Sequence, residues 1–228
     1  MAYSFVQAIA QPTASNHPTV SITNTSGNLL LLACVSLGNY TFTPSDTLGN
    51  TFVQVGTTAY VSSDGLLMAL YAAPNCKGGA NSIGVVNSNG TNVVPILAIE
   101  YSGIATTSPL LATAQNVAAN GGATTVSSGA TASNATVPAL VFGLTYDAGN
   151  TAAITAGAGF TSRAITNNTG AAAYFAIEDL RQTAAGAQTA NFTTNAGYNT
   201  YGTWVAVFNE AGGAVATHPN LMMLGVGS

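Results

Sequence analysis

Four of the ten charged side chains in this chain fall within residues 159–182. The stretch GFTSRAITNNTGAAAYFAIEDLRQ holds Arg163, Glu178, Asp179 and Arg181. Paired carboxylates carry out glycoside hydrolysis in many enzymes, and a carboxylate group completed by Glu100 could bind calcium through its oxygens. An arginine opposite a glutamate could instead form a structural ion pair.

The sequence around the cluster favours the ion pair. GFTSRAIT and AAYFAIEDL flank NNTG, a pattern that predicts a β-hairpin with Arg163 opposite Glu178. Such a cross-strand pair contributes about 0.2–1 kcal/mol when exposed. A hydrolase cleft would be rich in aromatic and charged groups, whereas the one tryptophan, Trp204, alternates with Ala206 and Phe208 on one face of a strand. We therefore predict a non-enzymatic protein, with calcium binding and hydrolysis as alternatives.

Other chemistry-bearing residues are few. His17 and His218 lie beside prolines near the ends of the chain, which predicts solvated loops. No Ser/His/Asp arrangement and no zinc-type spacing of Cys and His is visible, so we predict no catalytic residue, cofactor or metal site. Cys34 lies in an apolar strand and Cys76 in a loop; the sequence leaves open whether they pair, although a free, buried Cys34 is the simpler expectation.

The composition constrains the class of protein. Charged residues make up 4% of the chain, against roughly 25% in ordinary soluble domains, while 47% is hydrophobic. Its surface must therefore be built mainly from uncharged hydroxyl, amide and small side chains. The net charge is −4 and no basic run exists, which excludes a nucleic-acid partner and a polybasic membrane contact. The longest apolar run, LLLLACV, is far shorter than the roughly 20 residues of a membrane-spanning helix.

The first twenty residues lack the basic segment and the apolar run of a signal peptide. We expect synthesis in the cytoplasm and a final location in a virion or on an extracellular surface. The alternative is that a signal sequence has been removed.

Runs of β-branched and aromatic residues separated by Gly, Asn, Pro and Ser/Thr clusters predict an all-β protein, an antiparallel β-sandwich of jelly-roll-like type. The expected strands are 3–9, 19–23, 28–37, 51–61, 66–72, 82–86, 93–101, 123–127, 137–146, 160–166, 172–177, 189–193 and 200–209. TPSDTLGN is expected to be a loop, and LLATAQNVAANGGA at most a helical turn. No internal repeat is visible, and the nearest candidate for a domain boundary is the polar stretch 118–139. We therefore divide the chain into an N-terminal strand or arm (1–24), one β-sandwich domain (25–209) and a C-terminal tail (210–228).

Several segments, read in order, carry a resemblance: SGNLLLLACVS, DTLGNTF, LYAAPNCKGGANSI, AIEYSG, GAGFTSR, AIEDL and GTWVAVF. This series resembles a β-sandwich module of bacterial surface and phage structural proteins, over about residues 25–209. The resemblance implies a non-catalytic role in display, adhesion or assembly and no fixed ligand. The chain departs from the module at its C-terminus, which continues beyond the final strand.

The tail contains an uncharged apolar segment. Its large side chains are Leu221, Met222, Met223, Leu224 and Val226. Burying each contributes roughly 1.5–3 kcal/mol, so a few could anchor one subunit on another. We predict assembly contacts here; the alternative is that the tail folds back as a final strand.

Together these observations predict a structural protein of an ordered assembly: a phage decoration, capsid-associated or tail protein, or a surface filament subunit. Its partners would be copies of itself or other virion or filament proteins. The alternative is a carbohydrate-binding adhesin or lectin-like module that binds a surface glycan, with Tyr198 and Tyr201 as candidate stacking rings.

Overall fold

The computed structural model describes residues 2–11, 17–62, 65–88, 93–119, 122–148, 153–168, 173–194, 197 and 200–212. These residues form sixteen β-strands, every paired one antiparallel to its neighbours, and none of them lies in a helix. The part of the chain with described structure accordingly contains no helix able to cross a membrane. The predicted all-β antiparallel sandwich is confirmed.

The strands of the first half are β1 (Ser4–Gln11), β2 (Thr19–Asn24), β3 (Leu29–Leu37), β4 (Phe42–Asp46), β5 (Val53–Val61), β6 (Leu66–Ala73), β7 (Gly79–Asn87) and β8 (Val93–Ser102). Those of the second half are β9 (Leu110–Ala119), β10 (Thr125–Ser127), β11 (Ala139–Ala148), β12 (Ile154–Thr155), β13 (Thr161–Asn168), β14 (Ala173–Gln182), β15 (Asn191–Thr194) and β16 (Thr200–Asn209).

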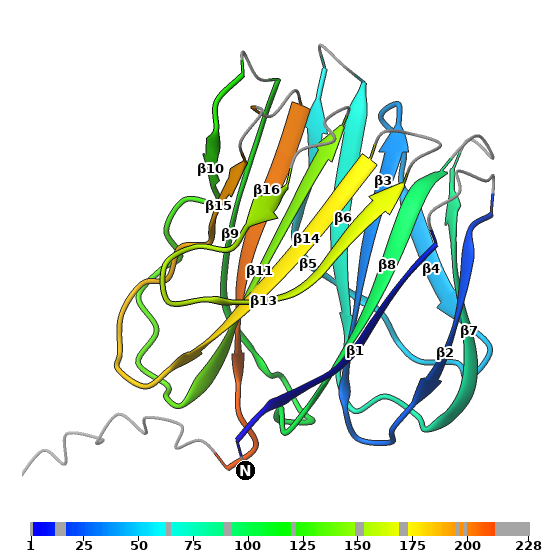
Figure 1. Ribbon diagram of the computed structural model, residues 1–228. Helices are drawn as coiled ribbons and strands as arrows, with labels where there is room; N and C mark the ends of the chain where they lie inside the picture. Colours follow the sequence, from blue (N-terminus) through cyan, green and yellow to red (C-terminus); the bar gives the residue numbers. More distant parts are fainter. Residues whose placement is uncertain are drawn as a thin grey trace, which may run out of the picture.

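The strands form four sheets stacked in four layers, which run from right to left in Figure 1. Outer sheet 1 has the order β2-β7-β4, and inner sheet 1 has the order β1-β8-β3-β6-β5. Inner sheet 2 follows with the order β13-β14-β11-β16-β9, and outer sheet 2 with β10-β15-β12. The two inner sheets pack face to face, and each carries its own outer sheet on the other face.

The strand order of the first eight strands is repeated by the second eight. Adding eight to each strand number of inner sheet 1 gives the order of inner sheet 2, and the same holds for the outer sheets. Each half is therefore an eight-stranded sandwich, which we call unit 1 (β1–β8) and unit 2 (β9–β16). In each unit the first, eighth, third and sixth strands are neighbours, as in nested Greek keys, but the fifth strand joins the inner sheet. We therefore describe the units by strand order rather than as jelly rolls.

This division differs from the one that the sequence predicted. Strands β1 and β2 pair with β8 and β7, so residues 4–11 and 19–24 are strands of unit 1 rather than a separate arm. The connection between the units is residues 103–109, and the polar stretch 118–139 lies inside unit 2. The repeat is a property of strand pairing that the side chains do not reveal.

The core consists of three layers, one between each pair of facing sheets. In β3, Leu29 and Leu31 point toward inner sheet 2, while Leu30 and Leu32 point toward outer sheet 1. Because this strand is buried on both faces, it reads as a continuous apolar run rather than an alternating one. The predicted shared face of Trp204, Ala206 and Phe208 is confirmed; all three are buried between the inner sheets. At about 25 cal/mol per Å² of apolar area, such burial is the main stabilising term.

Two predicted irregular segments are strands. Residues 43–46 of TPSDTLGN belong to β4 on the edge of outer sheet 1, where Pro44 is tolerated. Residues 110–119 of the Ala-rich segment expected to be at most a helical turn form β9, which pairs with β16. Pairing with a long neighbour outweighs the weak local preference of Ala and Asn.

Candidate functional site

The charged cluster lies where the two inner sheets meet along β1 and β13. Asp179 on β14 points between the inner sheets and is 1% exposed. Arg163 lies at an irregularity of β13 and donates from Nε to Asp179 Oδ2 (2.7 Å) and from Nη2 to Oδ1 (2.9 Å). This two-bond geometry is the strongest form of an arginine–carboxylate contact.

The predicted pair of Arg163 with Glu178 is therefore wrong in its partner. Glu178 and Asp179 are consecutive on a strand and point to opposite faces of the sheet. Glu178 pairs with Ser162, whereas Arg163 follows two residues after Thr161, the partner of Asp179, and so lies on the Asp179 face. The predicted antiparallel pairing is confirmed, because β13 pairs with β14 from Thr161–Asp179 to Asn168–Ala173.

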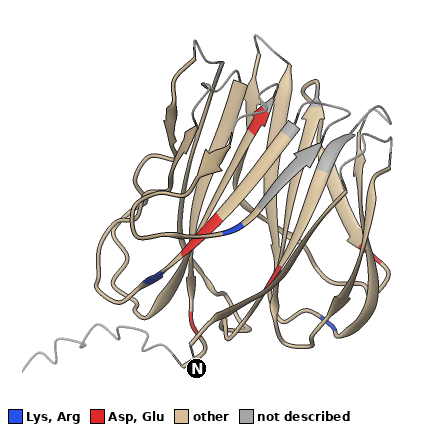
Figure 2. Ribbon diagram, viewed as in Figure 1, with Lys and Arg blue, Asp and Glu red and all other residues tan. Residues whose placement is uncertain are grey.

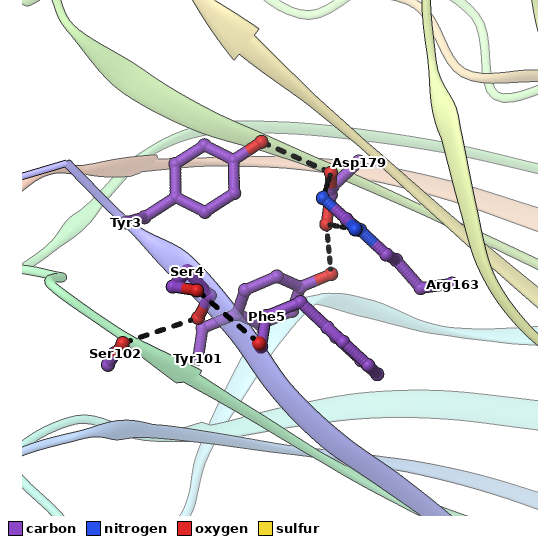
Figure 3. Close-up of polar contacts among 7 residues, drawn as sticks. All are labelled: Tyr3, Ser4, Phe5, Tyr101, Ser102, Arg163 and Asp179. Atoms are coloured by element: carbon purple, nitrogen blue, oxygen red, sulfur yellow. Dashed lines mark hydrogen bonds and ion pairs between the residues drawn. The ribbon is translucent and has the colours of Figure 1, made fainter.

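Two tyrosines of unit 1 complete the cluster (Figure 3). Tyr101 Oη donates to Asp179 Oδ2 (3.0 Å), and Tyr3 Oη donates to Oδ1 (3.2 Å). The Arg163 guanidinium lies 5.6 Å from the centre of the Phe5 ring. Because Tyr3, Phe5 and Tyr101 come from β1 and β8, while Arg163 and Asp179 come from β13 and β14, the cluster joins the two units.

The electrostatics of the cluster suit a structural link rather than proton transfer. Burial, followed by the nearby Asp179 carboxylate, raises the pKa of Tyr3 and of Tyr101 well above the usual range of tyrosine. The hydrogen bonds to Asp179 raise the pKa of Arg163 as well. The hydroxyls therefore stay protonated as donors, the guanidinium stays charged, and four hydrogen bonds occupy the carboxylate.

A second link between the units lies on the opposite edges of the inner sheets. The side-chain amide of Gln115 on β9 accepts from Thr57 N (3.1 Å) and donates to Thr57 O (2.6 Å) on β5. The amide thus behaves like a neighbouring strand and satisfies backbone groups of an edge strand. This contact was not predicted from the sequence, because a single Gln in an Ala-rich segment does not indicate which strand it will contact.

Glu178 points the other way, toward outer sheet 2, and is fully buried. Its Oε2 accepts a hydrogen bond from Gly157 N (2.6 Å), while no partner is found for Oε1 in the described part of the chain. Gly143 lies opposite on β11, where a Cβ atom would be 2.6 Å from Glu178 Cγ, so only glycine leaves room for this side chain. Burial raises the pKa of Glu178 to about 7.

Glu100 lies in unit 1 and points toward outer sheet 1. It accepts hydrogen bonds from Gln7 Nε2 (2.6 Å), Thr25 N (2.8 Å) and Asn28 Nδ2 (2.6 Å). Glu100, Glu178 and Asp179 therefore lie in three different layers, and the structure does not form the calcium site considered from the sequence. Within the residues that the structure describes, no group of three His, Cys, Asp or Glu side chains could hold a metal ion.

A second ion pair joins Arg181 on β14 to Glu210, just beyond β16. Arg181 Nε and Nη2 donate to the two carboxylate oxygens at 2.7 and 2.8 Å, and Glu210 is 1% exposed. The sequence had assigned residue 210 to the tail, so this partner was missed. Its burial extends the folded part of unit 2 past the final predicted strand.

Both cysteines are free and buried in the outer core of unit 1. Burial raises the pKa of the Cys34 thiol above its usual range and that of Cys76 to about 11, so both are protonated thiols. Cys76 Sγ contacts Thr25 O at 3.3 Å.

Charged residues are few and scattered along the ribbon (Figure 2). Most of the acidic side chains are buried. Five carboxylates are 2% exposed or less: Glu100, Asp147, Glu178, Asp179 and Glu210. Asp46 is half-buried, Lys77 is exposed, and the side chains of Arg163 and Arg181 are 32% and 45% exposed. Asp64 lies outside the described residues. The described exterior is therefore built almost entirely from uncharged groups.

Residues 213–228 lie outside the part of the chain that the structure describes. The predicted assembly contacts Leu221, Met222, Met223, Leu224 and Val226 fall there, as do His218 and, elsewhere, Tyr198. Tyr201 is half-buried and packs against the core of unit 2. Comparison of the chain with protein-family models, with curated proteins and with solved structures found no match.

Proposed function

We propose that this chain is a non-enzymatic structural protein of an ordered assembly, such as a phage decoration, capsid-associated or tail protein or a surface filament subunit. Its partners are copies of itself or other proteins of the same particle, and its location is a virion or an extracellular surface. The observation that carries the proposal is the placement of charge. Five carboxylates are withdrawn into the core, and the surface that faces outward is nearly uncharged.

The physical argument concerns how such a surface meets its neighbours. A freely diffusing protein normally keeps exposed charge that holds copies apart. A surface of hydroxyl, amide and small apolar groups lacks this repulsion, so copies can pack closely. Contacts between such surfaces also depend little on ionic strength, because salt screens only charges. These properties suit a subunit of a particle exposed to changing surroundings.

The charged clusters support the same role by making each subunit rigid. The bonds from Tyr3, Tyr101 and Arg163 to Asp179 hold the units together along one edge. The amide of Gln115 holds them along the other. A subunit fixed at both edges presents one constant shape to its neighbours.

Light scattering and negative-stain microscopy of the purified full chain test the proposal. We expect regular particles or filaments whose mass changes less than about twofold between low salt and about 1 M salt, since screening affects only exposed charges. A monodisperse monomer at high concentration, or assemblies that dissolve on adding salt, would contradict it.

A second candidate, a carbohydrate-binding module, is favoured by one groove in unit 1. This open groove of about 550 Å³ lies beside β1, β2 and β7. Its polar lining consists of Gln7, Ser21, Thr23, Thr47, Asn81 and Ser82. Neutral hydroxyl and amide groups are suitable partners for sugar hydroxyls, and the volume falls within the range of ligand sites.

A glycan array probed with the full chain tests the second candidate. The matched variant changes Thr23→Val and Ser82→Ala, which removes two hydroxyls from the groove with little change of shape. Binding that disappears in this variant would support a glycan site. Equal binding by both proteins would place the contact elsewhere.

A further inference from the structure

The two units can be aligned residue by residue through a shared irregularity. Strand β1 carries one extra residue directly after the pair Phe5–Tyr101. Strand β9 carries one extra residue directly after the pair Leu110–Phe208. Because β1 and β9 hold the same place in the repeated strand order, these bulges fix which residues correspond.

The inner sheets touch at two junctions that are equivalent under this alignment. At one junction β1 contacts β13, and at the other β9 contacts β5. Strand β9 corresponds to β1 and β5 corresponds to β13, so a pseudo-twofold axis exchanges the junctions. Corresponding residues therefore occupy equivalent positions at the two junctions.

The first junction is filled by the charged cluster, and the second is a groove. The alignment matches five groove residues with five residues of the first junction. Ser108 corresponds to Tyr3, Leu110 to Phe5 and Phe208 to Tyr101. Ala72 corresponds to Asp179 and Val53 to Thr161. Arg163 is an inserted residue with no counterpart in β5. Because Ser108 takes the place of a tyrosine and β5 has no inserted arginine, this junction keeps an open groove of about 340 Å³.

This groove is apolar and partly open to solvent. Its apolar lining includes Val53, Val55, Ala72, Pro109, Leu110 and Phe208. Val53 is 60% exposed and Leu110 is 39% exposed, whereas Phe208 at the base is fully buried. Among the residues that the structure describes, no charged side chain lines this groove. Its occupant should therefore be an uncharged apolar group.

The chain itself carries such a segment close by. Asn209 N donates to Pro109 O (2.8 Å), so the end of β16 lies against the groove wall. The described chain continues from there to Gly212. The segment LMMLGV, residues 221–226, follows within nine residues, which can span about 30 Å when extended.

We propose that residues 221–226 dock in this groove of their own molecule. The short connection gives the segment an effective concentration in the millimolar range, well above that of another copy in dilute solution. Leucine and methionine side chains match the uncharged lining and cover Val53 and Leu110. The docking of residues 221–226 goes beyond the proposed assembly role and does not depend on it.

A double-mutant cycle in the full chain tests the docking. The groove variant is Leu110→Thr, the tail variant carries Leu221→Ser and Leu224→Ser, and the third protein combines them. Unfolding in urea at low protein concentration gives each equilibrium constant. We expect a coupling between groove and tail of roughly tenfold. A coupling below about twofold overturns the proposal, since distant sites are nearly additive.

The matched control is Val86→Thr on β7, because Val86 is also 39% exposed but lies outside the groove. It should show no coupling to the tail variant, and equal coupling at Val86 would overturn a specific site. If Leu110→Thr fails to fold, Val53→Thr replaces it, since that side chain is more exposed.

A cross-link distinguishes docking within one molecule from exchange between molecules. Val53→Cys combined with Met223→Cys should give an intramolecular disulfide when the protein is oxidised in dilute solution. The native cysteines should not compete for this bond, because both are buried. Disulfide-linked dimers as the main product would overturn docking within one molecule. Neither outcome bears on whether larger particles form, so this test is separate from that of the assembly role.

Discussion

We expect the folding stability of the native chain to depend on pH between about pH 4.5 and pH 7, and replacing Glu178 by glutamine should abolish that dependence. The carboxyl is fully buried, and burial raises its pKa from 4.5 to about 7. The folded protein therefore holds a proton on Glu178 that the unfolded chain has released in this pH range. Stability contributed by the neutral carboxyl is fully present below about pH 4.5 and is lost as the pH rises through 7.

The size of the effect follows from the shift. One pKa unit corresponds to about 1.4 kcal/mol, so a rise from 4.5 to about 7 corresponds to about 3 kcal/mol. Glutamine keeps an acceptor for Gly157 N and cannot ionise. The amide group of glutamine adds a buried donor that costs about 1–3 kcal/mol. This cost is the same at every pH, so it lowers the free energy of unfolding without changing its pH dependence.

Urea unfolding at about pH 4.5, 6 and 8 measures this slope. The control is Asp46→Asn. Burial opposes ionisation of Asp46, but hydrogen bonds from Asn50 and Asn81 outweigh it and lower the pKa of this carboxyl. Its contribution is present above the usual carboxyl pKa and is lost only as the pH falls further. That variant should therefore keep the slope above pH 4.5, and equal slopes in the native chain and Glu178→Gln would refute the reasoning.

Three further substitutions test the structural links. Arg163→Leu leaves the buried carboxylate of Asp179 without its cation and should lower the free energy of unfolding by about 3–5 kcal/mol, measured in urea. Gln115→Leu removes the partner of both backbone groups of Thr57; it should cost about 1 kcal/mol and speed hydrogen exchange at that amide. Gly143→Ala pushes a methyl group into the carboxyl side chain opposite it and should cost about 1–3 kcal/mol by urea unfolding.

Each of these outcomes has a control in the same chain. Val86→Thr changes an exposed side chain and should change stability by less than about 0.5 kcal/mol. An Arg163→Leu protein as stable as this control would show that the cluster is not a structural link. Unchanged exchange at Thr57 in Gln115→Leu, or full stability of Gly143→Ala, would contradict the geometry described for those positions.

The strands were largely predictable because buried strands have characteristic local sequence patterns. The run LLLLACV predicted a strand buried on both faces, and the turn chemistry around NNTG predicted the hairpin of β13 and β14. The cluster's composition was predictable too, but not its pairing. The register of β13 on β14 decides which carboxylate the Arg163 guanidinium reaches, and sequence patterns do not resolve that register.

The repeat escaped prediction because corresponding residues have diverged. Tyr3 corresponds to Ser108 and Asp179 to Ala72, so an aromatic and a charged position in one unit are small in the other. A faint signal does exist: GNTF before β5 and GAGF before β13 share their first and last residues. Strand order is set by the alternation of buried faces, which many side chains can satisfy, and therefore outlasts residue identity.

The central core is built by both units together. Leu31 of unit 1 and Phe142 of unit 2 lie in the same apolar layer, so an isolated half would expose one whole face of its inner sheet to water. Separate melting of the halves is then disfavoured, and heating should give one transition. Scission of the chain within residues 103–109 should leave two fragments that remain associated and complement each other, because the bonds and burial across this layer do not pass through the connecting peptide.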